Sequence, residues 1–210
     1  RLLFEFPLSN ALKVQQIAVA AGATLQDVSI DEGPMGIAMQ NGALELKVTG
    51  EGISAGGDAL LNSVPVKVSW NESFQKSNSY KRKVNVIGDV SQAARQALGL
   101  PDLPFLNGSV AADVMFTMAF DGRREVVVEA DLQRASLDFP NLHWRKPPGS
   151  PGTVRAFAVV NADGGAVVEE LKITAGDLKA NARVELAPGS LDLQVLEFRS
   201  LQFAENELIG

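Results

Sequence analysis

A single histidine, His143, is the side chain of this sequence best suited to acid–base or metal chemistry, and it stands alone. A metal site needs several such ligands, and a Ser-His-Asp triad needs partners that this sequence does not supply. His143 lies in the proline-rich segment 142–149, which favours a structural or solvent-facing role. We therefore predict that it neither binds metal nor takes part in catalysis.

Other residues that could do chemistry are equally scattered. The aspartates fall at turn signals and on the polar sides of alternating segments, namely at Asp58, Asp89, Asp113, Asp121, Asp131 and Asp138. Nothing pairs two of them as general acid and base. The glycine-rich segments 33–36 and 149–152 lack the strand–loop–helix context of a phosphate loop. The absence of cysteine excludes disulfides, thiolate catalysis and cysteine metal sites. The sequence thus predicts no enzyme, no cofactor and no metal.

The charge and the hydropathy of the sequence limit the classes of partner that this chain could bind. The formal net charge is −6, which argues against nucleic acid because no basic field could replace its counterions. The basic cluster 81–83 is expected to be a solvated turn or strand start. The longest apolar run, residues 17–23, is far shorter than the roughly 18 residues of a membrane span. The chain opens at Arg1 inside an apolar run, and we expect 1–210 to be a fragment of a longer protein.

The elements that must position these side chains are strands with one apolar face. From Val110 to Phe120 every even position is apolar, and from Val126 to Leu132 the same holds. Asp113, Glu125 and other polar residues occupy positions between them. Strict alternation predicts strands with one dry and one wet face, here joined by a turn at 121–122.

The same pattern recurs along the chain. Alternating sets fill 64–70, 154–160 and 178–186. Turn signals separate the strands at short intervals, at 41–42 (Asn-Gly), 56–58 (Gly-Gly-Asp), 163–165 (Asp-Gly-Gly) and 188–190 (Pro-Gly-Ser). Spacing this close predicts an antiparallel meander and an all-β fold, built as one strongly curved sheet. A weak internal similarity between 23–28 and 135–142 suggests two similar halves, about 1–110 and 111–210.

Two segments interrupt the strands. Residues 91–98 have helical composition, with Ser91 as a start cap, Gly99 to close the helix and Pro101 to stop it. The prolines that follow Trp144 predict a rigid connection, and Trp144 is expected to pin it by packing against apolar neighbours.

The apolar faces admit two interpretations. In a β-sandwich they would form a closed core between two sheets. The alternative is an open face that receives a partner or lipid. For an all-β chain taken alone the closed core is the default interpretation, and the long, uniform apolar sets and four adaptable methionines weaken it. The aromatic content of 6% is low for a carbohydrate-binding sandwich.

Five segments resemble the AsmA-like family of bacterial envelope proteins, bridge-like lipid-transfer proteins related to TamB, and most closely its YhdP branch. They are GDALLNSVPVKVSW at 57–70, ALGLP at 97–101, LHWRKPPGSPG at 142–152, FEFPL at 4–8 and LEFRSL at 196–201. These motifs are structural and contain no catalytic signature.

The resemblance implies a periplasmic, taco-like β-groove with an apolar lining, anchored in the inner membrane by an N-terminal helix outside this fragment. The implied partners are phospholipids moving between the inner and outer membranes, together with other envelope proteins. The alternative is a scaffold for envelope assembly with a closed β-sandwich core. The residues expected to line the groove are Val66, Val68, Val114, Phe116, Met118, Phe120, Val126, Val128, Val184 and Leu186.

Overall fold

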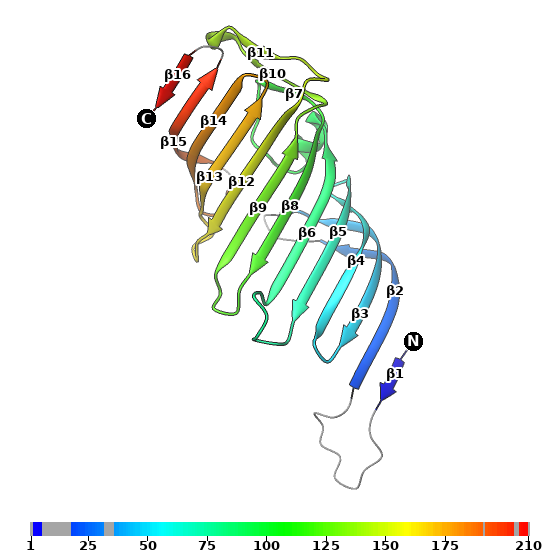
Figure 1. Ribbon diagram of the computed structural model, residues 1–210. Coiled ribbons are helices and arrows are strands. Elements are labelled where there is room, and N and C mark those ends of the chain that lie inside the picture. Colours follow the sequence, from blue (N-terminus) through cyan, green and yellow to red (C-terminus); the bar gives the residue numbers. More distant parts are fainter. Residues whose placement is uncertain (1, 6–17, 32–35, 191, 204–205, 210) are drawn as a thin grey trace.

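The computed structural model describes residues 2–5, 18–31, 36–190, 192–203 and 206–209, which form mostly β structure with one short α-helix. Thirteen strands make one antiparallel sheet that runs open from β1 to β16 and bends along its length (Figure 1). In spatial order they are β1 (Leu2–Glu5), β2 (Ala18–Ile30), β3 (Met39–Thr49), β4 (Gly52–Leu61), β5 (Val64–Ser73), β6 (Arg82–Val90), β8 (Val110–Met118), β9 (Arg124–Asp131), β12 (Gly152–Val160), β13 (Ala166–Ala175), β14 (Leu178–Leu186), β15 (Leu193–Phe203) and β16 (Asn206–Ile209). The predicted antiparallel meander is confirmed.

A second, three-stranded sheet was not predicted. It consists of β7 (Leu106–Gly108), β10 (Ala135–Phe139) and β11 (Trp144–Lys146), in the order β11-β10-β7. The chain leaves the large sheet twice to form these strands, once between β6 and β8 (the first excursion) and once between β9 and β12 (the second excursion). The second excursion also contains the 3-10 turn η3 (Pro140–Leu142). Strands of three to five residues offer too few alternating positions to be recognised from a sequence.

The predicted helix is confirmed as α1 (Gln92–Ala97), in the first excursion. Ser91 is its N-cap, and the Ser91 Oγ accepts a hydrogen bond from the Ala94 amide at 3.2 Å. Gly99 follows with a φ of +69°, a conformation that glycine adopts without steric cost. The turns at 121–122, 163–165 and 188–190 also connect successive strands as predicted.

The Asn-Gly signal at 41–42 was interpreted wrongly. These residues lie inside β3 and form a β-bulge, where the pairing with both β2 and β4 shifts register. Asn41 has a φ of +50°, which suits a bulge as well as a two-residue turn. The bulge brings Met39, at an odd position, to the same side of the sheet as Leu44. The change from odd to even apolar positions therefore marks a bulge here and not a hairpin.

The expected turn at 56–58 is also wrong, because these residues lie within β4. A Cβ atom on Gly57 would lie 2.0 Å from the carbonyl oxygen of Ala43 in the neighbouring strand. Glycine is needed here for the close approach of two backbones and not for a reversal of the chain.

Gly57→Ala is expected to lower the free energy of unfolding by about 1–3 kcal/mol, because the added methyl group must push β3 away from β4. Gly56→Ala is the matched control, since a Cβ at Gly56 would meet its nearest atom at an ordinary 3.4 Å. Urea denaturation measures both variants, and equal losses at the two glycines would contradict the explanation.

The small sheet and α1 pack on one end of the large sheet, at the top of Figure 1, and we call them the cap. One buried cluster joins Leu106, Leu137 and Trp144 of the cap to Val110, Ala175 and Leu178 of the large sheet. The Trp144 side chain is buried, packs against Phe139 with the two rings tilted and their centroids 5.9 Å apart, and donates Nε1–H to Asp177 Oδ1 at 2.7 Å. The predicted packing of Trp144 is confirmed.

Candidate functional site

Backbone pairing places apolar side chains in rows that cross the large sheet, because residues paired in register share one face. We call this side the apolar face. One row runs Trp70, Val84, Phe116, Val126, Ala158, Val168, Val184, Leu196. The next row runs Val68, Val86, Val114, Val128, Ala156, Leu171, Ala182, Phe198. A third row runs Val66, Gly88, Ala112, Ala130, Val154, Ile173, Ala180, Leu201.

The structure brings nine of the ten predicted residues onto this face. Seven lie in the three rows, namely Val66, Val68, Val114, Phe116, Val126, Val128 and Val184. Met118 and Leu186 lie in a further row toward the strand ends, which pairs Met118 with Arg124, Arg124 with Val160, Val160 with Ala166 and Ala166 with Leu186. The tenth, Phe120, lies in the turn between β8 and β9, beyond the paired residues.

Sequence reasoning missed other residues of the apolar face. In β13 the face is carried by Val168 and then by Leu171, because a bulge shifts the register between them. In β15 it passes from Leu193 to Leu196 and later from Phe198 to Leu201, with a register shift each time. The signal that could have found them is this change between odd and even apolar positions. Each bulge restores the alignment of the apolar residues on one face.

Most of these side chains are half-buried and few are enclosed. Phe116, Val126 and Val128 have intermediate exposure. Near the C-terminal edge Leu196 and Phe198 are 45% and 46% exposed, although they continue the same rows. Val66 and Val184 are buried. Among the described residues, neither buried cluster includes Phe116, Val126 or Val128.

The cap covers only one end of the apolar face. Its cluster contacts Ala130, Val154, Ile173 and Leu201, which belong to the third row. Ala94 and Leu98 of the α1 region pack against the adjoining cluster of Ala59, Val64 and Val66. The first row lies closer to the opposite strand ends.

Two buried cations hold the cap together. The Arg95 guanidinium donates to the carbonyl oxygens of Leu106 at 2.9 Å and Gly108 at 3.1 Å, which ties α1 to β7. The Lys146 Nζ donates to the carbonyl oxygens of Leu132 and Ala135, both at 2.8 Å. Burial lowers the pKa of Lys146, and the nearby Asp131 carboxylate offsets part of that change. Because backbone carbonyls satisfy these groups, they serve structure and are not free for catalysis.

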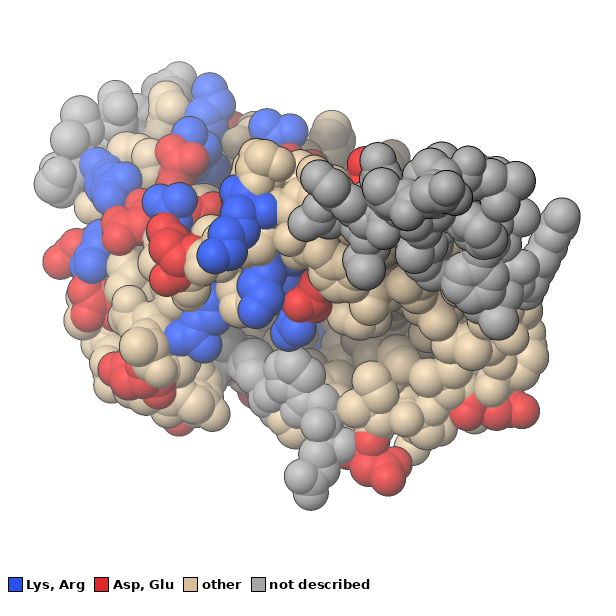
Figure 2. Space-filling view, turned by 90° about the horizontal axis from the view of Figure 1, so that it is seen from below, with Lys and Arg blue, Asp and Glu red and all other residues tan. Residues whose placement is uncertain are grey.

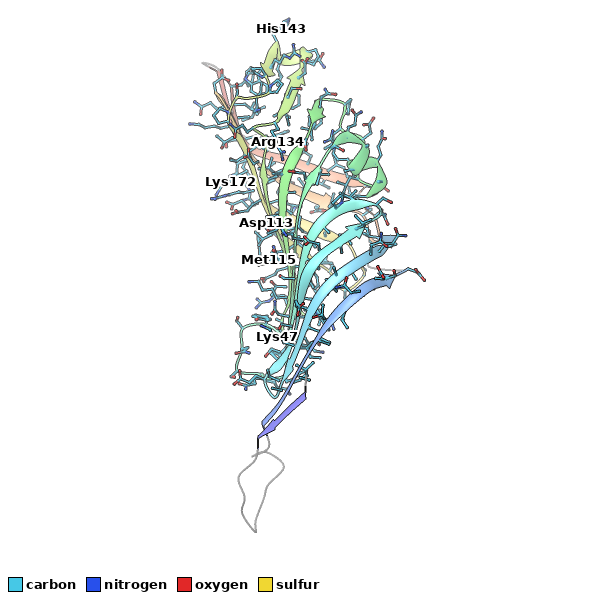
Figure 3. The ribbon with its side chains drawn as sticks, turned by 90° about the vertical axis from the view of Figure 1, so that its right-hand side faces the viewer. Lys47, Asp113, Met115, Arg134, His143 and Lys172 are labelled. Carbon is cyan, nitrogen blue, oxygen red and sulfur yellow. The ribbon has the colours of Figure 1, made fainter. Side chains whose placement is uncertain are left out.

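The opposite face of the sheet, which we call the outer face, carries most of the charged side chains, although Ile87, Met115, Val127 and Phe157 also lie on it. Figure 3 shows Lys47, Asp113 and Lys172 together on that side. Its cross-strand ion pairs include Lys67–Asp58 at 2.9 Å and Arg155–Glu129 at 3.3 Å. A hydrogen bond from Arg183 to Glu185 raises the pKa of Arg183. A shallow depression of about 870 Å³ beside β4, β5 and β6 places Leu60 and Ile87 of this face among the charged residues Asp58, Lys67 and Asp89.

The residues considered for catalysis remain apart. His143 is exposed at the end of η3, at the far tip of the cap (Figure 3). Within the described residues, no three histidine, aspartate or glutamate side chains gather where they could hold a metal ion. No helix in the described part of the chain is long and apolar enough to cross a membrane. The large sheet thus presents an extended apolar surface on one side and most of its charged side chains on the other.

Comparisons with known protein families, with curated proteins and with solved structures find no match to this chain.

Proposed function

We propose that the chain is a segment of a bridge-like lipid-transfer protein of the AsmA-like type, closest to its YhdP branch. In this proposal the bent sheet forms an open, taco-like groove, and the apolar face is its lining. The groove shelters the acyl chains of phospholipids while they move between the inner and outer membranes of a bacterial envelope, and the segment lies in the periplasm. The observation that carries the proposal is the continuity of the apolar rows from strand to strand.

The size of the uncovered surface supports this reading. Ten strands, β3 to β15 of the large sheet, extend over roughly 48 Å at about 4.8 Å per strand. The four residue steps from Val114 to Met118 add about 13 Å. The resulting area of roughly 600 Å² is at the upper end of what a monomeric protein exposes without a partner.

The distribution of charge supports it too. Figure 2 shows lysine, arginine, aspartate and glutamate crowded on the outer side, beside a hollow whose visible surface is largely uncharged. In Figure 3 the sheet bends away from Lys47, Asp113 and Lys172, so the apolar face lies on the inside of the bend. An acyl chain on that side would leave water while the charges of the protein remain hydrated.

The purified chain is expected to retain phospholipid. Mass spectrometry of its organic extract should detect phospholipid in near-stoichiometric amount, and the delipidated chain should rebind a fluorescent phospholipid. The physical reason is that burying the acyl chains removes both the lipid and the apolar face from water. A lipid-free extract together with no rebinding would reject the proposal and favour a scaffold role.

A further inference from the structure

The charged residues of the apolar face are confined to one place. In the described strands, the register assigns to this face only three charged side chains, Glu72, Arg82 and Arg124. Arg82 pairs with both Glu72 and Met118, and Met118 pairs with Arg124, so the three residues lie on neighbouring strands. They occupy the end of β5 and the starts of β6 and β9, at the edge opposite the cap. We call this edge the arginine rim.

Contacts at the arginine rim leave positive charge available. Arg82 Nε lies 2.8 Å from Glu72 Oε2, and the Arg82 side chain is 41% exposed while that of Glu72 is 15% exposed. Arg124 donates one N–H to the carbonyl oxygen of Asn161. Among the described residues, the terminal nitrogens of Arg82 and the remaining nitrogens of Arg124 have no hydrogen-bond partner. One carboxylate and two guanidinium groups give a net charge of about +1, and their planar donors match the oxygens of a phosphate.

The distance from the rim to the cap matches the length of an acyl chain. Six residues separate Arg124 from Ala130, which packs against the cap, and at ~3.3 Å per residue this is about 20 Å. The acyl region of one membrane leaflet is about 15 Å thick, half of a ~30 Å hydrocarbon core. A chain lying along β8 and β9 would therefore fit between the arginines and the cap.

We propose that Arg82 and Arg124 together bind the phosphate of a phospholipid whose acyl chains lie on the apolar face. Two strand spacings separate their backbones, about 10 Å. Arg82 contacts Glu72 of β5 and Arg124 contacts Asn161 next to β12, so both side chains must turn inward, toward β8, to close around one phosphate. This inference rests on the proposed function and adds to it the position and orientation of the lipid. The headgroup lies at the arginine rim and the chain ends point toward the cap.

A comparison of two lipids with identical chains tests the inference. Fluorescent phosphatidylglycerol carries the phosphate, and the corresponding diacylglycerol lacks it. The delipidated chain is expected to bind phosphatidylglycerol roughly tenfold more tightly or better. Arg124→Gln leaves the Glu72–Arg82 pair intact and should remove most of that preference while binding of diacylglycerol stays unchanged.

Neighbouring residues supply matched controls. Arg123 precedes Arg124 in the chain but pairs with Glu125 of the outer face at 3.5 Å, so Arg123→Gln should leave the preference intact. Glu72→Gln releases Arg82 and should increase the preference. Arg124→Lys keeps the positive charge and should retain part of the preference for phosphatidylglycerol. Inorganic phosphate alone should not compete, because the acyl chains supply most of the binding.

Three outcomes would overturn the inference. Equal binding of the two lipids by the unaltered chain would show that the phosphate is not recognised. An equal loss of preference in Arg123→Gln and Arg124→Gln would show only the general field of a basic edge. If the unaltered chain binds neither lipid, the proposed function is rejected as well. If it binds both lipids equally, only the phosphate site is rejected.

Discussion

Phe116→Asp is expected to leave the chain folded while removing its bound lipid. Phe116 lies in the middle of β8, half-buried, with Val84 and Val126 as its cross-strand neighbours on the apolar face. If the face opens to a groove, the new carboxylate reaches water through the mouth and stays hydrated. If the face were a closed core, the same charge would be buried without a partner at a cost of several kcal/mol, enough to unfold a marginal domain.

Two measurements on this variant separate the possibilities. Circular dichroism on heating reports whether the sheet survives, and mass spectrometry of the organic extract reports the lipid. Met115→Asp is the matched control because Met115 is the preceding residue of the same strand, is also half-buried, and lies on the outer face beside Asn85 and Val127. It should keep both fold and lipid. An unfolded Phe116→Asp variant would indicate a sandwich-like core, and a folded variant that keeps its lipid would place the lipid elsewhere.

Trp144→Ala is expected to destabilise the chain by about 3–5 kcal/mol, the usual cost of removing a large buried aromatic side chain. Trp144 is the aromatic centre of the cap cluster, between Phe139 and the residues of the large sheet. The substitution also removes the indole N–H that donates to Asp177. Trp144→Phe keeps most of the packing and should cost about 1.5–3 kcal/mol for the hydrogen bond to a charged group.

Chemical denaturation followed by circular dichroism measures these losses. His143→Asn is the neighbouring control, because His143 is exposed and its φ of +49° is one that asparagine also tolerates, so the unfolding midpoint should stay unchanged. Since the cap covers one end of the apolar face, Trp144→Ala should also increase the exposure of Val110 and Leu132 to solvent, visible as faster amide exchange at the start of β8 and just after β9. An unfolding midpoint equal to that of the unaltered chain would contradict the central role of Trp144.

The strands could be predicted from the sequence because the alternation of apolar and polar residues is a local property. A residue and its second neighbour point to the same side of any strand, whatever that strand pairs with. The sets at 110–118 and 178–186 therefore identified β8 and β14, and the capping residues Ser91 and Gly99 identified α1. The placement of nine predicted residues on one face of the sheet follows from the same rule.

Only the tertiary structure decided which strands lie beside one another. An Asn-Gly pair permits a positive φ in a turn or in a bulge, and only the adjacent strands β2 and β4 make residues 41–42 a bulge. The cap could not be predicted from the sequence, because its short strands come from segments about 30 residues apart in the chain.

The arginine rim shows the same division most clearly. In the sequence Glu72, Arg82 and Arg124 are three unrelated charges among many, and a basic cluster at 81–83 was expected only to be solvated. Backbone pairing assigns Arg82 to the apolar face and Lys83 to the outer face, opposite Thr117. Composition determined that this chain would build strands with one dry side. Hydrogen-bonded register between distant strands determined which charges that dry side would meet, because register is a long-range property that no local pattern contains.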